Sequence, residues 1–524
     1  MQPPDDPTAP FPPGSPAELA AFAALQARLR PMFQRLQGDP AAPRTVIVVP
    51  SLSMDPDVLA KVTGAHHYEE RMLSLLLLLR LPRTRVVYLT STPLADAVVD
   101  YVLHLLPGVP TSHARARLTL LACHDATGSA PLTAKLLARP RLLERLRGLV
   151  PDPHSAHITC FNATPLERTL AVRLGLPLYA CDPLLLPLGS KSGSRRLFRE
   201  AGLLLPEGAE GLRDAADLAA ALAALRRRDP ALRRAVVKLD EGFSGEGNAT
   251  FAFDGAPGGP GLEAWVRDRL PGLRFEARGM DWEAYAAKFA AMGGIAEAFV
   301  EGAEKRSPSA QLRIDPLGHV EAISTHDQVL GGPGGQVYLG CRFPADPAYA
   351  QAVQAAGLAV AGALRQRGVL GRFGVDFVSV RDPAGGWRHH AIEINLRKGG
   401  TTHPFQMLKL LTDGRYDPAT ASFATPDGTP CHYVASDNLE SERYRGLTPD
   451  DLIDIAVEHG LHFHGAAHEG VAFHLIGALS EFGKLGLTCV GPTPQRAAEL
   501  HARTAAVLDR AGGDPPVPAG TTAR

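Results

Sequence analysis

The feature that most constrains the fold of this sequence is an alternation of polar and apolar residues over positions 390–397. Glu393, Asn395 and Arg397 fall at every second position, so a β-strand would project them from one face of a sheet. The residues between them are apolar and would stabilise the strand by burial on the other face: Ile392, Ile394 and Leu396. A carboxylate, an amide oxygen and a guanidinium suit Mg²⁺ and phosphate. A polar sheet edge that faces solvent is the alternative.

A second strand is expected about twenty residues upstream, over positions 372–380. Its apolar residues share the face opposite Asp376: Phe373, Val375 and Phe377. If the two strands pair, Asp376 lies beside Glu393. Asp376, Glu393 and Asn395 would then offer Mg²⁺ the oxygen ligands that it prefers, and they are the predicted metal ligands.

Lysine is scarce, with nine Lys among the 54 basic residues, so each lysine position is informative. Lys238 ends an apolar run and leads into a glycine-rich turn between two expected strands. Gly242, Gly245 and Gly247 would let several backbone amides face one anion, and Lys238 would add a positive charge. The turn could therefore bind phosphate, although a plain surface turn fits the same pattern.

Lys191 lies just before an expected amphipathic helix that Ser192 or Ser194 could cap. A cation gains nothing from the helix dipole at that end, so Lys191 indicates either an anionic partner or a solvated turn. Further along, Glu297 begins an apolar strand end that carries carboxylates and is followed by Glu304. This segment fits a hinge that holds adenine and ribose, or an ordinary edge strand.

The order of these elements resembles the ATP-grasp superfamily over roughly residues 188–415. The resemblance implies ATP and Mg²⁺ as cofactors, with the Mg²⁺ ions on Asp376, Glu393 and Asn395. It also implies that the glycine-rich loop closes over the nucleotide, that Lys191 and Lys238 contact its α and β phosphates, and that Arg397 steadies the transferred phosphoryl group or the acyl phosphate. The implied nucleotide-binding residues are Lys191, Lys238, Gly242, Ser244, Gly245, Gly247, Glu297, Ala298, Phe299, Val300 and Glu304.

This chain departs from the D-alanine ligases at two positions. Gly374 stands where those enzymes place an arginine, and residues 326–328 stand where they use a further lysine. Other cations could therefore face the phosphates, and the candidates are Arg313, Arg342 and Lys398, although residues of these types are usually solvated surface charges. His326 could orient the substrate or be a hydrogen-bonded structural histidine. The expected catalytic residues are therefore Arg397, Lys238, Arg313 and His326.

The fold class that we expect is mixed α/β and α+β. Four short apolar strands alternate with helical stretches near positions 45–49, 85–89, 118–122 and 157–161, which predicts an open, mainly parallel sheet. The predicted organisation is a disordered or loosely packed arm (1–40), a pre-ATP-grasp α/β domain (41–187), a two-lobed ATP-grasp domain (188–415, with the glycine-rich loop at 241–248 and the metal strand at 391–397), a small α/β C-terminal accessory domain (425–510) and a flexible tail (511–524).

Composition excludes several other classes of function. The formal net charge of −1 gives no basic surface for nucleic acid. The leucine-rich run at 73–79 is too short to span a membrane and predicts a core helix. The six scattered cysteines lack zinc-binding spacing and, with an N-terminus that is not a signal peptide, indicate a cytoplasmic protein. Four histidines between positions 462 and 474 lack a matching set of ligands, so we favour a C-terminal domain that covers the active site, shapes a substrate tunnel or forms a dimer contact.

Residues 50–56, residues 324–332 and the C-terminal domain are similar to those of ATP-grasp peptide ligases of the pheganomycin-synthesis type. That resemblance implies activation of a small carboxylate, such as an amino acid, as an acyl phosphate. An amino acid or peptide amine would then form the amide, with release of ADP and phosphate. A homodimer is also an expectation from the resemblance. Two alternatives remain: ATP-grasp chemistry on a non-peptide small molecule, as a ligase or a kinase, and a regulatory protein that binds ATP without turnover.

Overall fold

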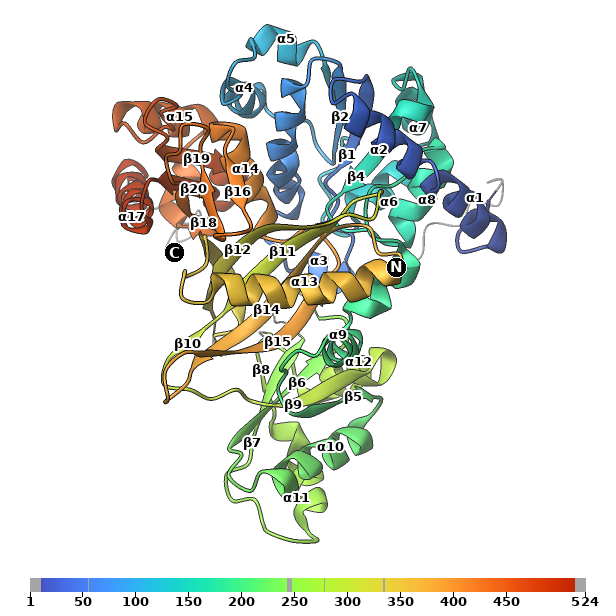
Figure 1. Cartoon of the computed structure of the whole chain (residues 1–524), viewed down its shortest axis with the longest axis vertical. Helices are drawn as coiled ribbons and strands as arrows, with labels where there is room; N and C mark the ends of the chain where they lie inside the picture. The colour runs from blue at the N-terminus through green and yellow to red at the C-terminus, as the bar shows by residue number, and fades with distance from the viewer. Residues whose placement is uncertain (1–10, 55, 243–246, 278, 333–334, 514–524) are drawn as a thin grey trace, which may run out of the picture.

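The structure is a computed structural model that describes residues 11–54, 56–242, 247–277, 279–332 and 335–513. Figure 1 shows an N-terminal region in blue at the top, a small lobe in green at the bottom and a C-terminal region in orange and red at the upper left, all arranged around a central sheet. The predicted loop residues Ser244 and Gly245 lie outside the described residues, as do most of the predicted flexible tail and the first ten residues of the predicted arm.

The N-terminal region is built on a parallel sheet of four strands in the order β3-β2-β1-β4. The four predicted strands are confirmed as β1 (Arg44–Val49), β2 (Thr84–Thr90), β3 (Leu118–Ala122) and β4 (Ala156–Cys160). The apolar runs of β1, β2 and β4 are buried on both faces, as is usual for a parallel sheet that helices cover, whereas the edge strand β3 is only half-buried. The covering and connecting helices are α3 (Pro56–Leu59), α4 (Asp96–His104), α5 (Thr111–Arg115), α6 (Leu132–Leu137), α7 (Pro140–Gly148), η2 (Pro153–Ser155) and α8 (Pro165–Leu174).

Two helices replace most of the predicted loose arm: α1 (Pro16–Gln26) and α2 (Leu29–Gly38). The prediction is wrong for these residues because they bury Phe22, Leu29 and Met32. Glu18 is also fully buried, where it accepts hydrogen bonds from Arg168 at 3.1 Å and from Thr169 at 2.6 Å. The proline-rich start of the segment is compatible with a helix because Pro16 occupies the first helical turn, directly after the N-cap Ser15.

The leucine-rich run lies in η1 (Ala65–Arg80), a 3₁₀ helix that packs against β2 and α14 (Thr402–Thr412). Most of its leucines are buried, which confirms the predicted core helix. Among the described residues, no helix is both long and apolar enough to cross a membrane.

The small lobe contains an antiparallel sheet of five strands in the order β5-β9-β6-β7-β8. The predicted strands on either side of the glycine-rich turn form the hairpin of β6 and β7, and helices α10 and α11 cover the sheet (Figure 1). Its elements are β5 (Gly208–Leu212), α10 (Ala215–Arg228), β6 (Arg234–Leu239), β7 (Asn248–Ala252), α11 (Leu262–Arg269), η4 (Leu270–Gly272), β8 (Arg274–Phe275), α12 (Trp282–Met292) and β9 (Gly294–Ala298).

The central sheet has nine strands and continues into the C-terminal region. Strands β13 and β18 join the two parts through paired residues such as Cys341 and Ala435. The strands are β10 (Lys305–Arg306), β11 (Pro308–Ile314), β12 (Val320–Gly331), β13 (Val337–Phe343), β14 (Gly371–Arg381), β15 (Trp387–Asn395), β18 (His432–Glu440), β19 (Gly470–His474) and β20 (Lys484–Gly491). The C-terminal domain therefore extends the sheet on which the predicted metal strands lie.

Helix α13 (Ala350–Gln366) covers β11 and β12, and the C-terminal strands share a hydrophobic core with η1. All six cysteines are buried and free. The remaining elements are η3 (Pro183–Gly189), α9 (Lys191–Glu200), β16 (Arg415–Asp417), β17 (Ser422–Ala424), η5 (Glu442–Gly446), α15 (Pro449–Glu458), α16 (Ala478–Phe482) and α17 (Pro494–Ala511).

Gly193, in the first turn of α9, allows this helix to approach η3 closely. A Cβ at this position would lie 2.0 Å from the carbonyl oxygen of Pro187. We therefore expect Gly193→Ala to lower the free energy of unfolding by about 3 kcal/mol, because backbone must move to admit the methyl group. The control is Gly362→Ala in α13, where a Cβ meets nothing within 4 Å. That variant should be stabilised by about 0.5–1 kcal/mol in urea denaturation, and an equal effect of the two variants would contradict the argument.

Candidate functional site

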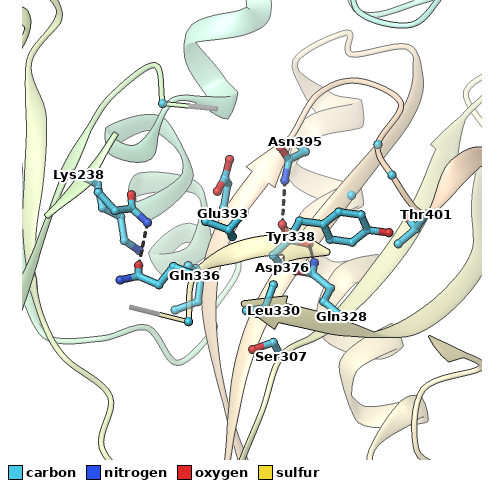
Figure 2. Close-up of a pocket in the computed structure, with 18 of the residues that line it drawn as sticks. Lys238, Ser307, Gln328, Leu330, Gln336, Tyr338, Asp376, Glu393, Asn395 and Thr401 are labelled. Carbon is cyan, nitrogen blue, oxygen red and sulfur yellow. Dashed lines mark hydrogen bonds between the residues drawn. The ribbon is translucent and has the colours of Figure 1, made fainter. Parts of the chain in front are cut away.

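A cleft of about 740 Å³ lies where the small lobe, the central sheet, the N-terminal region and the C-terminal region meet. Figure 2 shows its middle section, with Lys238 on one side, Glu393 and Asp376 in the centre and Thr401 on the other side. The predicted site residues among its lining are Lys191, Lys238, Gly242, Glu297, Ala298, Phe299, Val300, Asp376, Glu393, Asn395 and Arg397. The predicted metal ligands and most of the predicted nucleotide-binding residues therefore line one cavity.

The two predicted metal strands pair as β14 and β15, with Asp376 directly opposite Glu393. The carboxylate of Asp376 accepts hydrogen bonds from Gln328 at 2.7 Å and from Asn395 at 2.9 Å. Burial and the nearby charge of Glu393 raise the pKa of Asp376 to about 7. Burial alone would also raise the pKa of Glu393, but the charge and hydrogen bond of Lys191, 2.8 Å away, hold that pKa below its usual value.

One apolar residue of the metal strand departs from the prediction. The register shifts by one residue between Asp376 and Phe377, so Ile392 is the extra residue of a β-bulge. Ile392 consequently lines the cleft instead of being buried, whereas Ile394 and Leu396 are buried as predicted. The strand itself ends at Asn395, and Arg397 reaches the cleft from the segment that follows.

Lys191 is the first residue of helix α9, and Ser190 caps this helix, where we had predicted Ser192 or Ser194. The hydroxyl of Ser194 accepts a hydrogen bond from the backbone N–H of Ile394 at 3.0 Å. This bond ties the helix that carries Lys191 to the strand that carries Glu393. The position of Lys191 relative to the carboxylates is thus fixed by backbone contacts as well as by its ion pair.

Glu297 is buried under the cleft between two cations. It forms a short ion pair with Lys238 and a second ion pair with Arg195 at 2.9 Å. Its side chain is 3% exposed, so the charges have little access to water. The ion pair holds the amine of Lys238 at the cleft, which Glu297 itself also lines.

We expect Glu297→Gln to lower the free energy of unfolding by about 3 kcal/mol, because it leaves two buried cations without their counter-charge. The matched control is Glu301→Gln, which removes an exposed ion pair with Arg234 and should cost less than about 1 kcal/mol. Urea denaturation of both variants checks the prediction. Equal losses would show that Glu297 has no special structural role.

The last residue of β9, Ala298, and the two residues after it, Phe299 and Val300, form the apolar end of the cleft. The ring of Phe299 is covered by Arg234 and Lys305, whose cationic groups lie 4.0 Å and 4.2 Å from its centroid. Glu304, expected near the ribose, is not among the lining residues and instead pairs with Arg306 at 2.9 Å. In the described part of the loop, Gly242 and Gly247 approach so closely that a Cβ on Gly247 would lie 3.0 Å from the Cα of Gly242.

Two of the four expected catalytic residues lie away from the cleft. The guanidinium of Arg313 pairs with Glu321 across the β11–β12 hairpin. His326 is fully buried, its Nε2 lies 2.7 Å from the hydroxyl of Tyr433, and burial lowers its pKa to about 3. We therefore assign His326 to the core. Neither residue lines the cavity, unlike Lys238 and Arg397.

The other two cations proposed for the phosphates are also placed elsewhere. Arg342 is exposed on β13. The amine of Lys398 donates hydrogen bonds to Thr159 and to the backbone carbonyl of Cys160, at the end of β4. Lys398 therefore joins the metal strand to the N-terminal sheet and does not line the cleft.

The sequence did not reveal several polar residues at the far end of the cleft, among them Tyr68, Arg71, Asp437 and Lys484. They come from η1, β18 and β20, and no local spacing connects these segments. The scarcity of lysine was a usable signal for Lys484, as it had been for Lys191 and Lys238.

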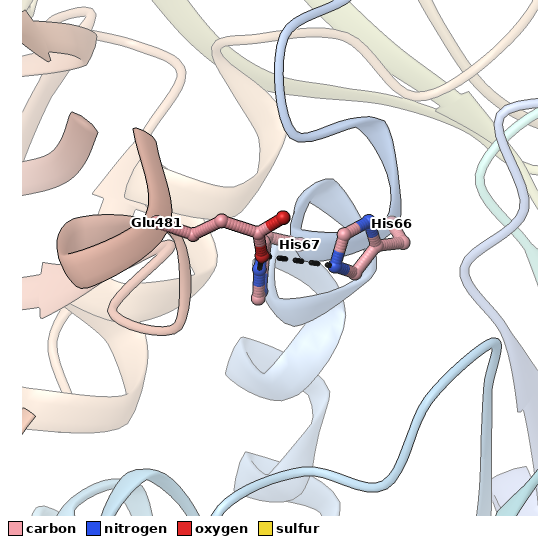
Figure 3. Close-up of side chains that lie close together, drawn as sticks. All are labelled: His66, His67 and Glu481. Atoms are coloured by element: carbon pink, nitrogen blue, oxygen red, sulfur yellow. Dashed lines mark hydrogen bonds and ion pairs between the residues drawn. The ribbon is translucent and has the colours of Figure 1, made fainter. Parts of the chain in front are cut away.

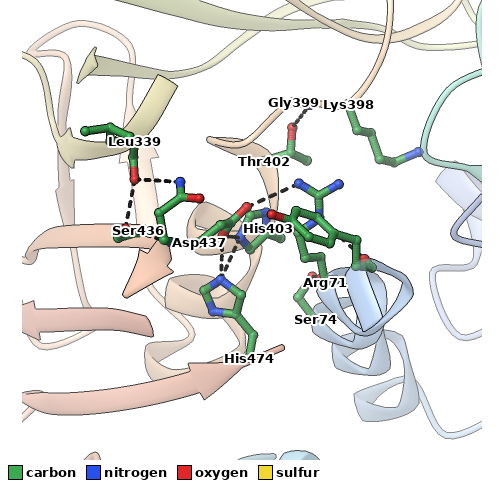
Figure 4. Close-up of polar contacts among 12 residues, drawn as sticks. Arg71, Ser74, Leu339, Lys398, Gly399, Thr402, His403, Ser436, Asp437 and His474 are labelled. Carbon is green, nitrogen blue, oxygen red and sulfur yellow. Dashed lines mark hydrogen bonds and ion pairs between the residues drawn. The ribbon is translucent and has the colours of Figure 1, made fainter. Parts of the chain in front are cut away.

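Asp437 is the centre of a buried polar cluster with His403 and His474, shown in Figure 4. Its Oδ1 lies 2.9 Å from His403 Nε2 and 2.7 Å from His474 Nε2, and its Oδ2 accepts a hydrogen bond from Arg71 at 3.2 Å. Burial alone would raise the pKa of Asp437, but the two histidines hold it well below its usual value. His474 is thus separated from the exposed histidines 462 and 464, with which the sequence had grouped it.

A second histidine pair joins the N-terminal region to the C-terminal region beside this cleft. Figure 3 shows His66 and His67 of η1 next to Glu481 of α16, with separations of 3.9 Å and 3.5 Å. His67 also lies 3.3 Å from Glu70, whose carboxylate accepts hydrogen bonds from the backbone N–H of Gly477. These contacts hold α16 and the segment before it against η1. Lys484 follows α16 by two residues.

Two protein-family models match parts of this sequence. The model described as IQCH-like, ATP-grasp matches residues 186–253 and 274–419, and the model described as PGM1 C-terminal domain matches residues 451–504. An L-propargylglycine–L-glutamate ligase of Streptantibioticus cattleyicolor is 33% identical over 478 residues, which cover 88% of this chain and 94% of that ligase. IQ motif-containing protein H of Danio rerio is 25% identical over 74% of this chain and 40% of its own length.

Solved structures resemble the fold of the whole chain. The biotin carboxylase of Campylobacter jejuni superimposes with a TM-score of 0.53 at 12% identity, covering 91% of this chain and 96% of that protein. The pyruvate carboxylase of Rhizobium etli gives 0.52 at 16% identity, covering 90% of this chain and 39% of that protein. These likenesses show the fold alone.

Proposed function

We propose, from the premise that this chain belongs to the ATP-grasp carboxylate–amine ligases of the pheganomycin-synthesis type, that it joins the carboxylate of an amino acid to the amine of an amino acid or peptide. As a member of that family the chain is an ATP-dependent, ADP-forming ligase. The choice of substrates is the proposal, and the 33% identical ligase, whose name specifies two amino acids, supports it. The observation that carries it is the meeting of Asp376, Glu393, Asn395 and Arg397 with Lys191 and Lys238 in one cleft.

In this proposal the apolar end of the cleft, at residues 298–300, holds adenine, and Lys191 and Lys238 contact the phosphates. An oxygen of the bound carboxylate attacks the γ-phosphorus, the bond to the β–γ bridging oxygen breaks, and ADP leaves. The amine nitrogen then attacks the carbonyl carbon of the acyl phosphate, phosphate leaves, and the nitrogen loses a proton to give the amide. Arg397 lies beside the two carboxylates and offsets the charge of the transferred group.

Mg²⁺ fits the residues that the strands bring together. Asp376, Glu393 and Asn395 are an all-oxygen donor set once the Asn395 amide presents its carbonyl. Burial, and then the adjacent charge of Glu393, raise the pKa of Asp376, and a divalent cation would stabilise both carboxylates in their charged form. When bound there, Mg²⁺ would neutralise phosphate charge. Gln328 and Lys191, which contact the two carboxylates, would keep them oriented.

The test is release of ADP and inorganic phosphate by the purified chain with Mg²⁺·ATP, first with pooled amino acids, then with short peptides, then with both. We expect release only when a carboxylate and an amine are present together, with an amide product in the mass spectrum. ADP release without phosphate would indicate a kinase, and ATP binding without turnover in any combination would indicate a regulatory protein. The expected homodimer is a separate prediction, which light scattering would test.

A further inference from the structure

The far end of the cleft carries a buried lysine that lacks a counter-ion. Lys484 is 6% exposed and lines the cleft from the start of β20. Among the described residues its amine has no hydrogen bond or ion pair, and the centroid of the Tyr68 ring lies 5.4 Å from it. Most of the side chain is buried and the residue lines the cleft, so an anionic ligand in the cleft would be a favourable partner for its positive charge.

Carboxylates on the elements around Lys484 are committed to other groups or exposed. Asp437 binds Arg71 and two histidines, and Glu70 binds His67 and the backbone N–H of Gly477. Glu440, the register partner of Lys484 on β18, is exposed and forms no ion pair with it in the described structure. The positive charge of Lys484 is therefore available to a ligand in the cleft.

Arg71 supplies a second cation at the same end of the cavity. Its guanidinium is held between the rings of Tyr68 and Phe161, with both centroids 4.6 Å from Cζ. One of its nitrogens donates to Asp437, which His403 and His474 hold in place (Figure 4). Arg71 and Lys484 thus share the ring of Tyr68, and Arg71 is fixed by a buried network instead of being a mobile surface charge.

This cationic end lies near the reacting centre. Arg71 and Lys484 line the same cleft as Arg397, Asp376 and Glu393. Phe161, whose ring lies against the guanidinium of Arg71, accepts through its backbone carbonyl the N–H of Lys398, the residue after Arg397, at 3.1 Å. A molecule that places its amine at the acyl phosphate could therefore extend its other end toward Arg71 and Lys484.

We propose that Arg71 and Lys484 form a carboxylate-binding subsite for the amine substrate, which they hold by the carboxylate that does not react. The inference rests on the proposed function and deepens it, because it identifies the amine substrate as an amino acid or short peptide with a free carboxylate. Simple amines and amino acid amides should be poor substrates, because they have no carboxylate to pair with Lys484.

The test compares an amine substrate that supports turnover with its own carboxamide, in the natural chain and in Lys484→Met. In the natural chain we expect the carboxamide to have a kcat/KM about 100-fold lower than the acid, and Lys484→Met to raise KM for the acid about 100-fold with kcat within a few-fold. The carboxamide should be nearly unaffected by the substitution. Lys288→Met, on α12 outside the cleft lining, is the matched control and should behave as the natural chain.

Thermal unfolding without substrates tests the same idea independently of turnover. If Lys484 has no partner in the absence of substrate, Lys484→Met should melt at the same or a higher temperature, because the substitution removes an unpaired charge from a largely buried side chain. Equal use of acid and carboxamide by the natural chain, or a Lys484→Met variant that melts lower and keeps its KM, would overturn the subsite and leave the ligase assignment intact. If no pair of substrates supports turnover, the proposed function fails, and the melting comparison still decides whether Lys484 is an unpaired cation.

Discussion

Glu393→Gln should abolish turnover and leave the fold intact. The substitution keeps the shape of the side chain but removes one of the two carboxylates that face each other across β14 and β15. We expect kcat to fall by about 10³-fold or more, because phosphoryl transfer depends on charge neutralisation at this point. The substitution removes the ion pair with Lys191, but it also removes the repulsion between Glu393 and Asp376, and the two effects offset each other. The melting temperature without nucleotide should therefore change by no more than a few degrees.

Two measurements separate this result from a folding defect. Mg²⁺·ATP should raise the melting temperature of the natural chain but not that of Glu393→Gln. Glu283→Gln, an exposed substitution on α12, should match the natural chain in both turnover and stabilisation. Substantial ligation by Glu393→Gln would remove Glu393 from the metal site.

Arg397→Met should have an effect on kcat of similar size with a smaller effect on ATP binding. Arg397 lines the cleft beside Asp376 and Glu393, where negative charge develops during transfer of the phosphoryl group. Arginines in this role contribute about 10³-fold or more to kcat, and methionine preserves most of the side-chain volume without the charge. Steady-state kinetics together with nucleotide binding at equilibrium would measure the two effects separately.

The control for this variant is Arg415→Met, at an exposed arginine of β16. It should leave kcat and ATP affinity unchanged. An Arg397→Met variant that loses ATP affinity and keeps its kcat would indicate that Arg397 holds the nucleotide in the ground state only.

The metal strands were predictable from the sequence because their signal is local. Side chains alternate with a period of two in any strand, so Glu393 and Asn395 could be assigned to one face before the fold was known. The connection between β14 and β15 is short, which favours direct pairing of Asp376 with Glu393. The bulge at Ile392 was not predictable, because it depends on the register of hydrogen bonds between two strands.

Residue type alone was a poor guide to the catalytic cations. The prediction that Arg313 and His326 are catalytic rested on their residue types and their positions in the sequence. In the structure Arg313 pairs with Glu321 and His326 contacts Tyr433, and the sequence does not display either contact. The two N-terminal helices were missed for a related reason. Their first residues look disordered by composition, and the buried partner of Glu18 is Arg168, far along the chain.

The far end of the cleft was the least predictable part of the site. Arg71, Asp437 and Lys484 are assembled from three distant segments, and only the folding of the C-terminal strands onto η1 brings them together. Their role depends on surrounding residues such as the buried histidines 403 and 474, and spacing along the chain does not predict these contacts.

The most direct test of the account follows an oxygen atom through the reaction. A carboxylate substrate labelled with the heavy oxygen isotope would be incubated with the chain, Mg²⁺·ATP and the amine substrate, and the released phosphate and nucleotide analysed by mass spectrometry. Activation as an acyl phosphate predicts transfer of one labelled oxygen to inorganic phosphate for each amide formed, with unlabelled ADP. Unlabelled phosphate, or label in AMP, would contradict the account.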